Sequence, residues 1–104
     1  MKIEYGVIGQ SLKVYATIKD RQGRKQDLTG ATDAVFKYMP PAGAEGEIAA
    51  DIEADGRISA TLAGSILSSP GEYRIMASAM LGTEEVKSFG FIIRILPEFQ
   101  PIPG

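Results

Sequence analysis

Three acidic residues are the first groups in this sequence whose type and spacing suggest chemistry. Asp51 and Glu53 alternate along an expected strand, so their carboxylates share one face, and Asp55 follows in the next turn. Grouped carboxylates are the ligands that calcium prefers, but this spacing matches no calcium-binding loop. We therefore interpret the three residues as a solvated polar face and predict no metal site.

The serines offer a second chemistry, nucleophilic catalysis. Ser65, Ser68 and Ser69 lie close together, but the chain has no histidine and no cysteine. The commonest general base and the thiolate nucleophile are therefore both missing. No glycine-rich turn leads into a helix, as a phosphate cradle requires. We predict no catalytic residue, no cofactor-binding residue and no cofactor, and hence a protein that is not an enzyme.

The basic residues give a weak indication of nucleic-acid binding. Four of them crowd the tip of one expected hairpin: Lys19, Arg21, Arg24 and Lys25. Asp20 and Asp27 dilute their charge, so we interpret this tip as solvated. Tyr15 with Lys13 and Lys19 resembles a base-stacking site, but a solvated strand face explains this trio equally well. Because the formal net charge is −2, we predict no nucleic-acid partner.

Strands must position these residues, because apolar and polar side chains alternate through most of the chain. The cleanest run spans residues 11–19, and its apolar face consists of Leu12, Val14, Ala16 and Ile18. Turn signals recur at intervals of about eight to twelve residues. We predict an all-β, immunoglobulin-like antiparallel β-sandwich of about seven to eight strands. One short helical turn is expected within residues 62–67, where the apolar spacing changes.

The sharpest corner of the chain is Pro70-Gly71, which leads into the longest alternating run, residues 71–81. Tyr73 lies just inside this corner. One interpretation is a tyrosine corner, in which the ring is buried and the hydroxyl returns to nearby backbone. The other is a core tyrosine with a solvated hydroxyl. The sequence leaves both open.

The last expected strand spans about residues 85–96, with a bulge near Ser88, where the alternation changes phase. On its outer face, Ile92 and Leu96 are unusually apolar for solvent-exposed positions. We expect another strand, a partner chain or the tail to bury them in part.

The expected core comprises Leu12, Val14, Ile18, Leu28, Phe36, Ile48, Ile58, Leu62, Tyr73, Ile75, Phe89, Phe91 and Ile93.

The prolines near the C-terminus predict the domain organisation of the chain. Residues 1–96 are expected to form the sandwich, and residues 97–104 contain three prolines, which favour an extended tail or linker. Phe99 and Ile102 are candidate partner-docking residues, because two apolar anchors on a stiff segment suit a groove of a neighbouring subunit. The alternative is a frayed terminus.

The first residues, Met1-Lys2-Ile3-Glu4, do not resemble a signal peptide, because they lack its continuous apolar region. No apolar run approaches the length of a membrane span. We therefore expect synthesis in the cytoplasm, no signal peptide and no membrane partner.

The order of the turn motifs carries a family resemblance. The motifs are Gly9-Gln10-Ser11, Asp27-Leu28-Thr29-Gly30, the 42–46 loop, Asp55-Gly56, Ile66-Leu67 and Pro70-Gly71-Glu72-Tyr73. In this order they resemble the immunoglobulin-like N-terminal domain of phage baseplate upper proteins and related small virion modules of tailed phages and prophages. The resemblance covers about residues 9–96. Those baseplate proteins continue into long helices and a receptor-binding-protein platform, which this sequence does not contain.

The resemblance implies a structural protein of a virion, with an assembly role in a baseplate, a tail or a head–tail accessory. The implied partners are other virion proteins or further copies of the chain, as a homo-oligomer, and the implied location is the virion. The alternative is a carbohydrate- or surface-binding β-sandwich module of a larger bacterial protein. Such modules usually present aromatic side chains on one flat face, for which Tyr5, Tyr15 and Tyr38 are the candidates.

Overall fold

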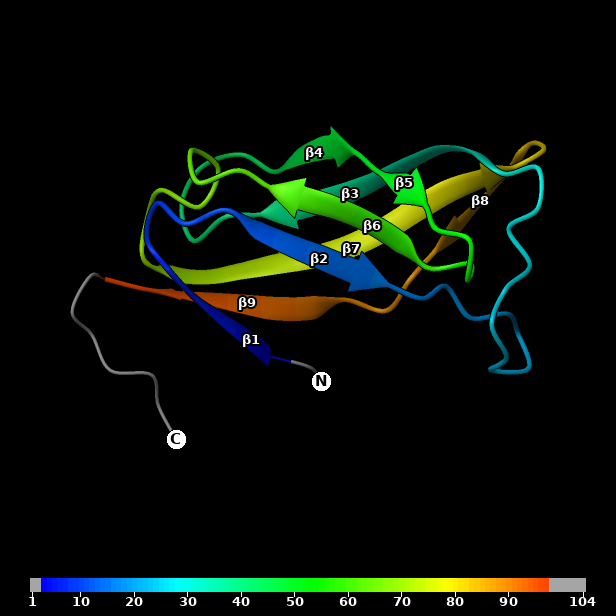
Figure 1. Ribbon diagram of the computed structural model, residues 1–104, viewed down its shortest axis with the longest axis horizontal. Helices are drawn as coiled ribbons and strands as arrows, with labels where there is room; N and C mark the ends of the chain where they lie inside the picture. The colour runs from blue at the N-terminus through cyan, green and yellow to red at the C-terminus, as the bar shows by residue number, and fades with distance from the viewer. Residues whose placement is uncertain (1–2, 98–104) are drawn as a thin grey trace.

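A computed structural model describes residues 3–97 and shows an all-β protein with two sheets (Figure 1). The strands are β1 (Ile3–Val7), β2 (Leu12–Ala16), β3 (Thr32–Met39), β4 (Gly46–Ala49), β5 (Asp51–Ile52), β6 (Ile58–Leu62), β7 (Gly71–Leu81), β8 (Glu84–Lys87) and β9 (Phe91–Leu96). The predicted all-β sandwich is confirmed. At the expected helical turn, the backbone N–H of Leu67 donates to the carbonyl of Ala63, with 3.2 Å between nitrogen and oxygen.

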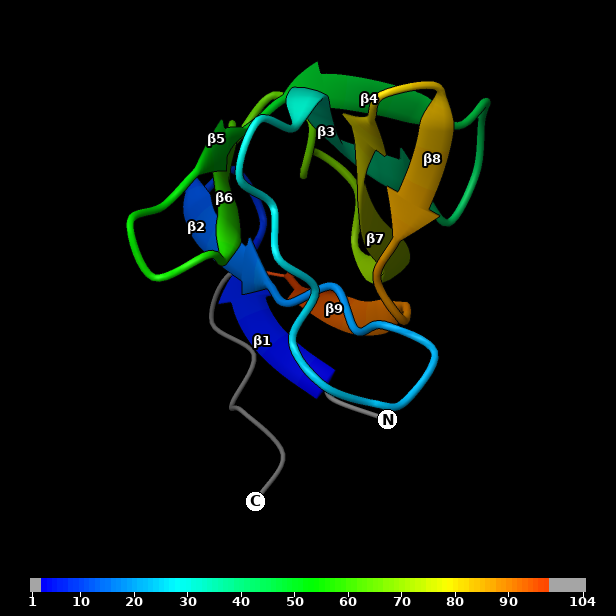
Figure 2. The same cartoon turned by 90° about the vertical axis from the view of Figure 1, so that its right-hand side faces the viewer.

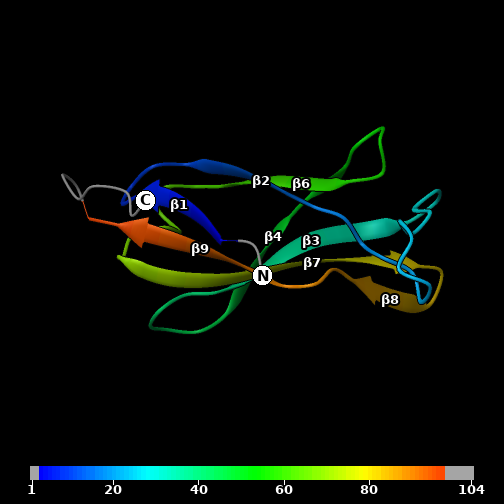
Figure 3. The same ribbon diagram turned by 90° about the horizontal axis from the view of Figure 1, so that it is seen from below.

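The two sheets form the two layers of the sandwich, as Figures 2 and 3 show. The larger sheet has the order β1-β9-β7-β3-β4, with β8 paired to β7 beyond the end of β9, and the smaller sheet has the order β2-β6-β5. The strands pair antiparallel, except that β1 lies parallel to β9. The first strand, β1, therefore lies at an edge of the larger sheet.

The alternating run of residues 47–53 forms two short strands, β4 and β5, which lie in different sheets. β4 pairs with β3 in the larger sheet, whereas β5 pairs with β6 in the smaller one. Ala50 lies at the crossing, and its N–H donates to the carbonyl of Ala34 across 2.9 Å. This crossing, and a break between β8 and β9, raise the number of strands above the predicted seven to eight.

The core lies between the two sheets and contains most of the predicted residues. The buried apolar side chains include Val14, Ile18, Leu28, Phe36, Ile58, Leu62, Leu67, Tyr73, Ile75, Ala77, Ala79, Phe91, Ile93 and Ile95. Leu12 and Ile48 are only partly buried and pack against this cluster. The prediction for Phe89 is wrong, because 84% of this residue is exposed.

Tyr73 forms the tyrosine corner, which decides between the two interpretations. Only 1% of the residue is exposed. Its hydroxyl donates to the carbonyl of Ser69 at 2.9 Å and accepts the N–H of the same residue at 3.1 Å. The phenol thus closes the turn before β7 by satisfying both backbone groups of Ser69, while its ring lies in the core.

Candidate interaction surface

A β-bulge separates β8 from β9, both of which pair with β7. The N–H of Ser88 donates to the carbonyl of Ala77 at 2.9 Å, and Phe91 lies opposite Ile75. From Ala77 to Ile75, β7 advances by two residues, whereas the facing chain advances by three, from Ser88 to Phe91. One extra residue on one strand is a bulge, which confirms the prediction near Ser88.

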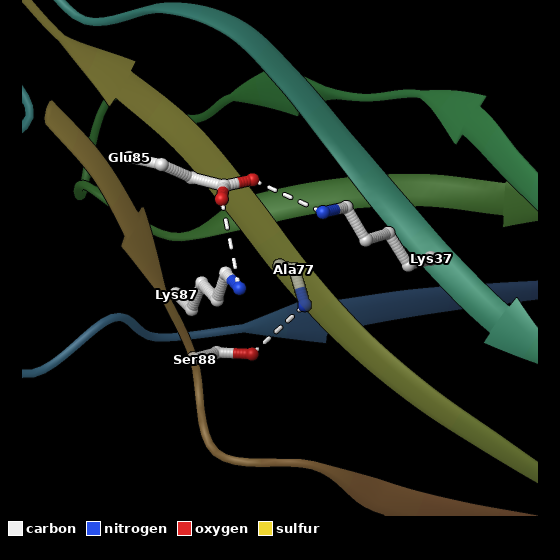
Figure 4. A network of polar contacts seen from close by, with 5 residues as sticks. All are labelled: Lys37, Ala77, Glu85, Lys87 and Ser88. Atoms are coloured by element: carbon white, nitrogen blue, oxygen red, sulfur yellow. Dashed lines mark hydrogen bonds and ion pairs between the residues drawn. The ribbon is translucent and has the colours of Figure 1, made fainter. Parts of the chain in front are cut away.

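The side chain of Ser88 holds the bulge in place. Its Oγ accepts the N–H of Ala77 at 2.9 Å and donates to the carbonyl of Phe89 at 3.0 Å. Figure 4 shows the Ser88 hydroxyl pointing at the Ala77 nitrogen. In a regular ladder a backbone carbonyl would accept this N–H, so the hydroxyl replaces the carbonyl at the point where pairing stops.

The bulge explains why Phe89 lies outside. Alternation counted back from Phe91 places Phe89 on the buried face. The extra residue shifts this phase, so the inward positions are Val86 and Ser88 before the break and Phe91 after it. Phe89 falls on the loop between them and is directed to the surface.

Three apolar residues and one arginine form a row across the outer face of the larger sheet. In the strand register Ile3 lies beside Ile92, Ile92 beside Arg74, and Arg74 beside Met39. Side chains at paired positions share one face of a sheet. In the described chain, the exposed large hydrophobic residues are Ile3, Met39 and Phe89. We call Ile3, Met39, Arg74, Phe89 and Ile92 the outer patch.

The outer patch is hollowed beside Phe89. Arg74, Phe89, Gly90, Phe91 and Ile92 line an open hollow of about 740 Å³. A smaller hollow of about 230 Å³ adjoins it, with Arg74 and Gly90 in both linings. A concave apolar surface with an aromatic ring on its rim can accept apolar side chains of another molecule.

Ile92 and Leu96, which the sequence expected to be covered, differ in their burial. Leu96 is 9% exposed, and Ile92 is half-buried beside Ile3 of β1. Strand pairing therefore supplies part of the expected cover, and Ile92 keeps an accessible side in the outer patch.

Ion pairs surround the outer patch. The Nζ of Lys37 lies 3.0 Å from one carboxylate oxygen of Glu85, and the Nζ of Lys87 lies 3.6 Å from the other (Figure 4). The hydrogen bond from Lys37 lowers the pKa of Glu85. Arg94 pairs with Glu72 further along β9 and β7. The outer patch therefore lies between charged groups that are already paired.

The acidic residues considered for metal binding do not converge. Asp55 accepts the backbone N–H of Arg57 at 3.0 Å and pairs with its side chain at 2.7 Å. The backbone hydrogen bond lowers the pKa of Asp55. Asp51 lies in β5, opposite Ser59 of β6. Within residues 3–97, no three acidic residues gather closely enough to hold a metal ion.

The three candidate tyrosines lie in three different settings. The Tyr15 ring is covered by Arg57, whose Cζ is 4.3 Å from the ring centre, and by Lys13 at 5.4 Å. The Tyr5 ring lies under Arg94 at 5.9 Å, and Tyr38 packs against the core. The three rings do not form one flat face that would suit a sugar.

The basic hairpin is held by the fold, because Lys19 and Lys25 form an isolated backbone bridge. In the described chain, the cations that lie over the Tyr15 ring are Lys13 and Arg57. The Nζ of Lys25 donates to the carbonyl of Asp55 at 2.5 Å. This lysine therefore joins the hairpin tip to the turn between β5 and β6.

Phe99 and Ile102, the docking residues proposed from the sequence, lie outside the described residues. Between residues 3 and 97 there is no helix long and apolar enough to cross a membrane.

Comparison of the chain with known protein families finds no match, and comparison with curated proteins finds none either. The phage resemblance therefore stays a prediction from the turn motifs.

Proposed function

We propose that this chain is a non-enzymatic assembly module of a tailed phage or prophage virion, which acts through protein–protein contacts in a baseplate, a tail or a head–tail accessory. The outer patch is the observation that carries the contact role. The order of the turn motifs supports the virion role.

The composition of the outer patch suits a protein interface. Aromatic residues, methionine and arginine are enriched at such interfaces, and the patch contains Phe89, Met39 and Arg74. Burial of an exposed phenylalanine side chain contributes roughly 1.5–3 kcal/mol. Because 84% of Phe89 is accessible, nearly all of this contribution is available to a partner.

The position of Phe89 also suits an anchor. It follows Ser88, which is 8% exposed and fixed by two hydrogen bonds to neighbouring backbone. A side chain presented by a fixed backbone loses less conformational freedom on binding than one on a loose loop. The bulge thus presents an aromatic anchor next to a hollow in the same sheet face.

The experiment is mass spectrometry of virions purified from the source strain after prophage induction. We expect the chain in the purified particles at a constant ratio to tail proteins, and genes for tail or head proteins beside its own gene. A chain that is expressed in the cells but absent from the particles, at a locus without such genes, would contradict the virion role.

A further inference from the structure

We propose that Arg74 is the carboxylate-binding group of the outer patch, and that the partner is a protein segment with a carboxylate flanked by apolar side chains. This inference rests on the outer patch being a docking surface, as proposed above. It does not depend on the virion role.

The first argument is the pairing of charges on this face of the larger sheet. In the described chain, Lys37 and Lys87 pair with Glu85, and Arg94 pairs with Glu72. Arg74 lies on the same face and forms no ion pair with any residue from 3 to 97. Glu45 shares the smaller hollow with Arg74, but the two are not paired. Among the residues that the structure describes on this face, Arg74 is thus the cation that is left for a partner.

The second argument is the position of Arg74 inside the patch. The strand register places it between Met39 and Ile92, and it lines the larger hollow with Phe89. A partner that covers Phe89 and Ile92 must also remove water from the guanidinium group. A buried charge without a counter-charge is costly, whereas a carboxylate pairs with arginine through two parallel hydrogen bonds. A partner that covers this patch is therefore favoured when it places an anionic group at Arg74.

The same charge argues against a second copy of the chain as the occupant. In a two-fold symmetric contact the same patch faces itself. Arg74 lies within the row rather than at its end, so patch-to-patch packing would bring two guanidinium groups close together. Glu72 is already paired with Arg94, and Glu45 lies in the smaller hollow, outside the row of apolar residues. The complementary occupant is therefore a different surface, one that carries a carboxylate between apolar groups.

The test uses the full chain and two small probes that differ only in charge, 3-phenylpropionate and its neutral amide. Titration followed by NMR should shift the backbone amides of residues 89–92, with an affinity for the carboxylate about five- to tenfold above that for the amide. Arg74→Met should remove this preference. Arg21→Met, which changes an exposed cation of the basic hairpin that lines neither hollow, should retain it. Native-like spectra of both variants would establish that they fold.

Each result has a separate meaning. Equal affinity for the two probes at residues 89–92, or a preference that survives Arg74→Met, would overturn the role of Arg74 while leaving the patch as an apolar docking surface. If neither probe perturbed residues 89–92, the result would count against both the inference and the docking surface. Neither result bears on whether the chain is found in virions.

Discussion

Replacement of Tyr73 by alanine should lower the free energy of unfolding by about 3–5 kcal/mol. The ring is 1% exposed and belongs to the core cluster, so its removal leaves a cavity between the sheets. The loss also frees the two backbone groups of Ser69 that the hydroxyl satisfies. Urea denaturation measures the change, which approaches half of the total stability of a small domain.

Tyr73→Phe is the matched control, because it retains the ring and removes only the hydroxyl. It should cost about 1–3 kcal/mol, since the N–H and carbonyl of Ser69 lose their partner. An alanine variant that lost less than about 1 kcal/mol would show that the corner and its ring do not hold the sheets together.

Replacement of Ser88 by alanine should lower the free energy of unfolding by about 1–3 kcal/mol. The hydroxyl is the acceptor for the N–H of Ala77, which lies in the middle of the long strand β7. Without it, this buried donor has no partner unless the bulge rearranges. We also expect the amide resonance of Gly90 to move, because the same hydroxyl donates to the carbonyl of Phe89, which belongs to the same peptide group.

Ser68→Ala serves as the control for Ser88→Ala. Ser68 is exposed, so its replacement should change the stability by no more than about 0.5 kcal/mol. Equal stabilities of the two variants in urea denaturation would contradict the role of Ser88 in fixing the bulge.

The local features of this fold could be predicted from the sequence because short-range rules govern them. Two-residue alternation identified β7, and Asp55-Gly56 identified the turn before β6, where Gly56 adopts a φ of 85°. Pro70-Gly71 followed by Tyr73 placed the corner. Each of these signals lies within a few residues of the structure that it predicts.

The candidate site could not be predicted in the same way, because it depends on register and on one extra residue. The row of Ile3, Ile92, Arg74 and Met39 exists only through the pairing of four strands that are distant in sequence. The phase change around Ser88 did indicate a bulge. However, the position of the bulge relative to Phe89 decides whether the Phe89 ring lies on the buried or the exposed side of the sheet. Only the pairing of β8 and β9 with β7 shows that position.

The switch between sheets at Ala50 has a similar cause. The alternation of Ile48, Ala50 and Ile52 continues without a break, so it reads as one strand. Only the partners differ: β4 hydrogen-bonds to β3, and β5 hydrogen-bonds to β6. A periodic pattern reports which side chains face inward, but it does not report which sheet supplies the neighbour.

The most direct test of the central claim, that this chain assembles through the outer patch, is the amount of a Phe89→Ser variant in purified virions. Phe89 is 84% exposed, so the variant should fold with a stability within about 0.5 kcal/mol of the original chain. Its amount in the particles, measured by mass spectrometry, should fall by roughly tenfold or more, because anchors dominate interface energies. Thr61→Ala, at an exposed position of the smaller sheet, should be incorporated normally. Incorporation of Phe89→Ser at the level of the original chain would contradict the account.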